Sequence, residues 1–148
     1  MNKISVTVEI AAPAARVWAV MSDVDRWHEW TPSITSVQRV DGRPLELGTG
    51  VMIRQPKFPA ARWTVTALVP GEYFAWTSKV PGLLRVVGTH AVTPTEEGAR
   101  AMLSIEIHGM LGGLWESLTR DITEKYVTME ARGLKARCED PSYRHGSA

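Results

Sequence analysis

Four histidines are the side chains of this sequence best suited to exchange a proton near neutral pH. His90 has the most informative neighbours, because Val86 and Val92 share its parity along a segment that alternates apolar and polar residues. If that segment is a strand, the imidazole points to the apolar side, where it could orient a ligand hydroxyl or act as a general base. It could equally be a core histidine, satisfied by a neighbouring hydroxyl or carbonyl.

The other histidines have weaker settings. His28 lies between Trp27 and Trp30 and would contact a ligand only if those rings close a pocket. His108 and His145 fit positions at the surface and in the chain's tail. The histidines stand on different segments without a His-x-x-x-His spacing, so we expect no metal. We also expect no cofactor.

Charged side chains offer little further chemistry. Glu106 has the outward parity of its strand, where pairing with a neighbouring cation is the alternative to acid catalysis. Arg54 and Arg62 flank a proline-containing turn and could meet an acidic ligand at a cavity mouth, or could simply be solvated. Cys138 is the single cysteine, so no internal disulfide can form and we interpret the thiol as incidental. No Gly-x-Ser-x-Gly, phosphate-binding glycine loop or dinucleotide fingerprint occurs.

Six tryptophans are the most unusual feature of the composition. Each ring has a large apolar area to bury, and rings with a few polar groups among them are typical of a ligand pocket. The same rings could instead fill a solid core.

The alternation of apolar residues predicts the elements that position these side chains. Ile4, Val6, Val8 and Ile10 mark a first strand. Pro13 opens a short helix that carries Val17, Trp18 and Met21 at helical spacing, and a second short helix, capped by Ser22 or Asp23, leads towards Trp27. Turn-forming residues, among them Asp41-Gly42-Arg43-Pro44 and Pro70-Gly71, then separate six further segments. These predicted strands are 35–40, 50–55, 61–69, 72–79, 83–94 and 99–109. Short connections indicate an antiparallel sheet.

Strand parity also predicts which side chains face inward. The inward sets are Trp63, Val65, Ala67 and Val69; Phe74 and Trp76; Leu84, Val86, Gly88, His90 and Val92; and Leu103, Ile105 and Ile107.

The last predicted element is a long amphipathic helix over 114–138. Its apolar stripe is predicted from residues three or four apart: Leu114, Leu118, Ile122, Tyr126 and Met129, with Trp115 beside it. Residues 140–148 have little to bury and are expected to form a frayed tail.

Composition sets the outer limits. The 148 residues, 44% hydrophobic, suffice for one domain with a real core. A net charge of +1 without a basic block argues against nucleic acid as a partner. No apolar run is long enough for a transmembrane segment, and no signal peptide is evident, so we expect a cytoplasmic protein. Monomer and homodimer both remain open.

The order of elements carries a resemblance. Together with Ala12-Pro13 to Trp18, the Trp27 to Pro32 segment, the Pro-Gly turn and Gly88-Thr89-His90, it resembles the START-related superfamily SRPBCC, close to its polyketide cyclase/dehydrase-like branch. The resemblance implies an α+β helix-grip fold over residues 1–139: a seven-stranded antiparallel sheet wraps around the long C-terminal helix, and two short helices lie between the first and second strands. An apolar cavity between sheet and helix is implied as well.

Three functions follow as alternatives: binding of a small hydrophobic molecule such as a lipid, polyketide or isoprenoid-like compound; a polyketide cyclase or aromatase; and a protein-interaction module. The first needs only the cavity, whereas the second needs several inward polar groups, of which His90 is the candidate catalytic residue. The expected ligand-binding residues are Trp27, Trp30, Trp63, Trp76, His90, Trp115, Leu118 and Ile122.

Overall fold

The computed structural model describes residues 2–39 and 44–142. Its elements, in chain order, are β1 (Asn2–Ile10), α1 (Ala14–Ser22), the 3-10 helix η1 (Val24–Glu29), β2 (Ser36–Arg39), β3 (Gly50–Gln55), β4 (Phe58–Val69), β5 (Tyr73–Val80), β6 (Leu84–Thr95), β7 (Gly98–His108) and α2 (Gly112–Glu139). The predicted turn at 41–44 falls outside the described residues except for Pro44, as does the tail from residue 143.

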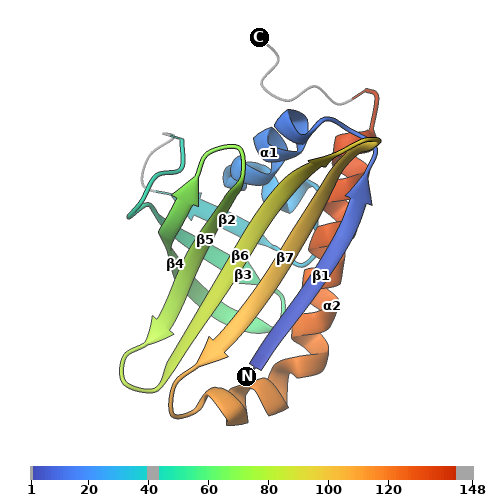
Figure 1. Cartoon of the computed structure of the whole chain (residues 1–148). Coiled ribbons are helices and arrows are strands. Elements are labelled where there is room, and N and C mark those ends of the chain that lie inside the picture. Colours follow the sequence, from blue (N-terminus) through green and yellow to red (C-terminus); the bar gives the residue numbers. More distant parts are fainter. Residues whose placement is uncertain (1, 40–43, 143–148) are drawn as a thin grey trace.

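The strands form one antiparallel sheet in the order β1-β7-β6-β5-β4-β3-β2. The first two strands of the chain therefore lie at opposite edges, and α1 and η1 span the distance between them. Helix α2 packs against β1 and β7 and meets α1 at one end (Figure 1). This is the predicted helix-grip fold, with the long helix held by a curved sheet.

The strand registers confirm most of the predicted inward parity. On β6, Gly88, His90 and Val92 are buried, and on β7, Leu103 and Ile107 are buried. Strand β4 differs, because the register with β5 shifts between Val65 and Ala67. An irregularity of this kind exchanges the two faces of a strand. Consequently Leu68, rather than Ala67 or Val69, packs against the core.

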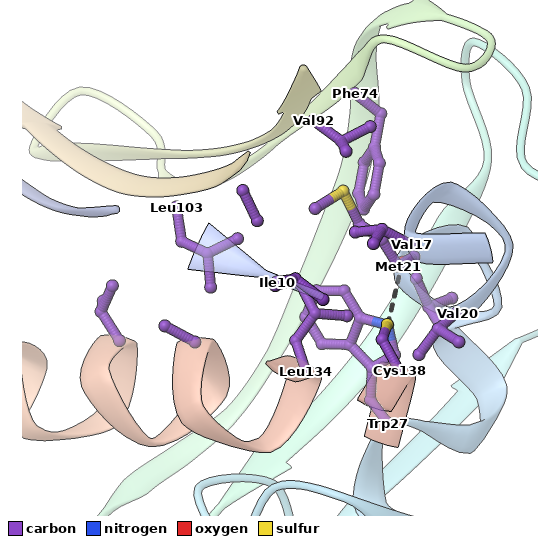
Figure 2. Close-up of a cluster of buried hydrophobic side chains, with 14 of the residues drawn as sticks. Ile10, Val17, Val20, Met21, Trp27, Phe74, Val92, Leu103, Leu134 and Cys138 are labelled. Carbon is purple, nitrogen blue, oxygen red and sulfur yellow. Dashed lines mark hydrogen bonds between the residues drawn. The ribbon is translucent and has the colours of Figure 1, made fainter. Parts of the chain in front are cut away.

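The main core lies between the sheet, the short helices and the C-terminal half of α2. Its fully buried side chains come from elements far apart in sequence, including Ile10, Val17, Phe74 and Leu134 (Figure 2). Trp27 lies among them, and its indole Nε1 donates a 3.0 Å hydrogen bond to the carbonyl oxygen of Met21. This bond satisfies the polar atom of a ring that is otherwise surrounded by apolar groups.

The buried face of α2 differs from the predicted stripe. Leu114 and Leu118 are 59% and 73% exposed, so these two positions are corrected: they face solvent. The residues buried on this helix are Gly112, Thr119, Tyr126, Val127, Ala131, Leu134 and Cys138. Near its start, the inner face of the helix carries the small residue Gly112 and the polar residue Thr119. The large aliphatic side chains in this part of the helix therefore do not identify the face that packs against the core.

Candidate functional site

A cavity of about 460 Å³ lies between the sheet and α2. Its volume falls within the range of small-molecule sites. The lining side chains from the sheet are Gln55, Phe58, Pro59, Ala60, Ala61, Arg62, Trp63, Ser78, Lys79, Val80, Leu84, Val86, Ile105 and Ile107, and those from α2 are Trp115, Thr123, Tyr126, Val127 and Glu130.

Aromatic rings from opposite sides meet in this cavity. Phe58, at the start of β4, lies with its ring centroid 6.1 Å from that of Trp115 and 5.8 Å from that of Tyr126. Trp63 lines the cavity from further along β4. The β3–β4 hairpin places Phe58 here, because its Gln55–Phe58 pair leaves only Pro56 and Lys57 as the connection. The predicted strand at 61–69 therefore begins three residues earlier than expected.

A second aromatic cluster lies deeper and holds His90. The imidazole stacks on Phe74, with centroids 4.6 Å apart, and meets Trp27 and Trp76 nearly edge-on at 5.0 and 5.3 Å. It is only 5% exposed, and it is not among the cavity-lining residues. The structure thus places His90 in the packed core, the alternative that the sequence left open.

Burial also fixes the protonation state of His90. Removal of the ring from water lowers its pKa from 6.5 to about 3, although a hydrogen bond to the backbone of Phe74 acts in the opposite direction. Among the described residues Nδ1 has no hydrogen-bond partner. The imidazole is therefore neutral at pH 7, and it does not line the cavity.

Glu130 is the acidic residue among those that line the cavity. It lies on the inner face of α2, one helical turn after Tyr126, and is half-buried. Burial raises the pKa of its carboxyl from 4.5 to about 8, since an apolar setting disfavours the charged form. The carboxyl is consequently mostly protonated at neutral pH and can both donate and accept a hydrogen bond.

The predicted ligand-binding residues divide into three groups. Trp63 and Trp115 line the cavity. Trp27 and Trp76 belong to the inner cluster around His90, and Trp30 packs against Trp27 at 5.3 Å. Leu118 and Ile122 are on α2 but outside the cavity lining, to which this helix contributes Trp115, Thr123, Tyr126, Val127 and Glu130.

The remaining candidates stand apart from a common site. His28 and Arg54 are exposed, and His108 is half-buried outside the cavity lining. Arg62 lines the cavity rim, but its guanidinium lies over Gly50. Glu106 alternates with the inward Ile105 and Ile107, so it faces away from the cavity as predicted.

Cys138 is buried, and burial raises the pKa of its thiol to about 12. Such a thiol is unreactive at neutral pH. Within residues 2–39 and 44–142, no three His, Cys, Asp or Glu side chains gather as metal ligands would. None of the helices in the described part of the chain is long and apolar enough to cross a membrane.

Glu130, Phe58 and Tyr126 are the site residues that the sequence did not reveal as a group. The sequence does carry a signal for Glu130. Val127 lies three residues before it and Leu134 four residues after it, so this acid stands on an otherwise apolar face of the helix. Phe58 was hidden between two prolines in a stretch interpreted as a turn.

A family model described as polyketide cyclase / dehydrase and lipid transport matches residues 1–139. No curated protein sequence matches significantly.

Among solved structures, a protein of Thermus thermophilus is 20% identical with a TM-score of 0.74, over 95% of this chain and 99% of that one. A hypothetical protein of Helicobacter pylori is 14% identical with a TM-score of 0.75, over 92% and 86% of the two chains. The di-domain ARO/CYC StfQ of the steffimycin biosynthetic pathway is 17% identical with a TM-score of 0.71, covering 93% of this chain and 50% of that one. At these identities the likenesses concern the fold.

Proposed function

We propose that this chain, which belongs to the polyketide cyclase / dehydrase and lipid transport family, binds a small, largely hydrophobic molecule in the cavity between the sheet and α2. The molecule's class is a lipid, polyketide or isoprenoid-like compound.

The single observation that supports this function best is the aromatic lining of a cavity of about 460 Å³. Phe58, Trp63 and Trp115 present rings to the cavity space, and Val86, Ile105 and Ile107 add aliphatic surface. A core built only for stability would close around such side chains, because interiors pack to nearly crystalline density. An apolar body of matching size would gain from leaving water there.

A neutral dye tests this proposal. We expect N-phenyl-1-naphthylamine to bind saturably with a stoichiometry of one and to quench tryptophan emission, since Trp63 and Trp115 line the cavity. Thr123→Phe, which fills the cavity from α2, should weaken dye binding by about tenfold or more, equivalent to about 1.4 kcal/mol. Asp121→Phe, an exposed position on the same helix, is the matched control. Quenching without saturation, or equal binding by the Thr123→Phe protein, would contradict the proposal.

A second candidate, a polyketide cyclase/dehydrase-type enzyme, is favoured specifically by Glu130. A carboxyl with a pKa of about 8 is suited to general acid–base catalysis at neutral pH. As a carboxylate it would take a proton from a methylene between two carbonyls, and the resulting enolate carbon would add to a ketone, whose alkoxide oxygen takes that proton back from the carboxyl. The carboxylate would then remove the second proton from the same carbon and pass it to the departing hydroxyl, which leaves as water as the carbon–carbon double bond forms.

Turnover of a poly-β-keto surrogate separates the two candidates. An enzyme should cyclise the surrogate, and Glu130→Gln should lower the rate by roughly 10²–10⁴ while binding persists, the usual contribution of a positioned acid–base group. Binding by the wild type without any product would leave the carrier function alone.

A further inference from the structure

We propose that the cavity selects a ligand with a positively charged head, an ammonium group on an apolar body, and that Glu130 is its counter-ion. This inference rests on the proposed ligand-binding function and adds the chemical class of the ligand's polar end.

The first support is the isolation of the carboxyl. In the described part of the chain, Glu130 makes no hydrogen bond or ion pair, and burial is the only cause of its pKa shift. The other charged residues of the cavity lining, Arg62 and Lys79, are exposed. Because this carboxyl has no partner among the described residues, it is available to form an ion pair or a hydrogen bond with a bound ligand.

The second support is the aromatic surroundings. Tyr126 lies one turn before Glu130, and the Phe58 ring lies 5.8 Å from the Tyr126 ring and 6.1 Å from that of Trp115. Aromatic faces attract ammonium groups, and sets of such faces recognise quaternary ammonium ligands. A carboxyl and several rings in one cavity together favour a cation over a neutral polar head.

An anionic head fits the same cavity poorly. The carboxylate of a fatty acid would lie in an apolar space with Glu130, and two neighbouring acids cannot both ionise without a large rise in pKa. Since Arg62 and Lys79 are exposed, neither is a buried counter-ion for such a head. The cavity should therefore discriminate between ligands by charge as well as by shape.

The protonation of Glu130 gives this selection a measurable signature. With a pKa of about 8, the carboxyl of the empty cavity is mostly protonated at pH 7. A cation nearby lowers the pKa of a carboxyl, so binding should expel a proton. A ligand with a fixed charge cannot supply that proton, which must then come from the protein.

Calorimetric titration with three decyl probes tests the inference: decyltrimethylammonium, 1-decanol and decanoate, at pH 7 in two buffers of different ionisation enthalpy. We expect decyltrimethylammonium to bind most tightly and to release close to one proton. Glu130→Gln should weaken its binding by about tenfold to a hundredfold, because the carboxylate that pairs with the cation is lost, and should abolish proton release. Binding of 1-decanol should change little.

Glu124→Gln, which removes an exposed carboxyl of the same helix, should leave all three affinities and the proton release unchanged. Thermal unfolding of each variant confirms that it is folded. Should 1-decanol bind while decyltrimethylammonium binds no tighter and releases no proton, the charge selection is overturned and the proposed function stands. If none of the three probes binds the wild type, both fail together.

Discussion

The backbone carbonyl of Trp30 lies directly against Gly133 of α2, so close that a Cβ atom on Gly133 would be 2.0 Å from its oxygen. This contact joins the segment after η1 to the long helix. Only glycine permits the two backbones to approach this closely.

Gly133→Ala should therefore destabilise the fold by about 1–3 kcal/mol, the range for overpacking, even though alanine favours a helix. Gly113, on the same helix, has nothing within 4 Å of its would-be Cβ. Gly113→Ala should be neutral or stabilising by up to about 1 kcal/mol. Urea denaturation of both variants measures the contrast, and equal stability would contradict the contact.

His90 should make the fold sensitive to acid. Its pKa is about 3 in the native state and about 6.5 when unfolded, so the unfolded chain binds an additional proton between these values. Stability then rises with pH across this window and falls on acidification. Between pH 7 and pH 5 the loss should be about 1–2 kcal/mol at roughly 1.4 kcal/mol per pKa unit. His90→Phe, which cannot be protonated, should lack this part of the acid dependence in urea titrations at the two pH values.

Glu130 should act in the opposite direction. Its native pKa of about 8 exceeds the ordinary value of 4.5, so the folded protein holds a proton that the unfolded chain has already lost. Stability therefore falls as the pH rises from 4.5 to 8. Relative to the wild type, the free energy of unfolding of Glu130→Gln should increase by about 1–3 kcal/mol between pH 5 and pH 9. This is less than the full pKa shift implies, because the cavity admits water. A constant difference between the two proteins across this range would show that the carboxyl titrates normally.

The two faces of α2 should respond differently to charge. Leu134 is 1% exposed and Leu118 is 73% exposed. Leu134→Asp leaves an unpaired charge in the core and should unfold a domain of ordinary stability. Leu118→Asp should change the free energy of unfolding by no more than about 0.5 kcal/mol. Circular dichroism melting curves distinguish these outcomes.

Sequence periodicity predicted the sheet because burial in a strand follows a period of two. Once the turns between strands were located, the inward set on β6, with His90 and Val92, followed directly. The parity failed on β4, where the register shift between Val65 and Ala67 leaves no mark in residue types.

The site was harder to predict because a cavity wall can carry polar residues at inward positions, which breaks the apolar pattern that identifies a core. The inner face of α2 carries Thr123 and Glu130 where a solid core would have aliphatic residues. Leu114 and Leu118 therefore produced a misleading stripe near the start of the helix. The position of His90 outside the cavity depends on how rings of several elements pack, which strand parity alone cannot decide.

The placement of the first strand and the last helix has a consequence for biosynthesis. β1 pairs with β7, α2 packs against β1, and the Lys135 ammonium donates a hydrogen bond to the carbonyl of Glu9 across 126 residues. Contacts of such long sequence separation form slowly. A ribosome must release α2 before the cavity has its second wall, so a ligand can first be enclosed only after translation of the helix is complete.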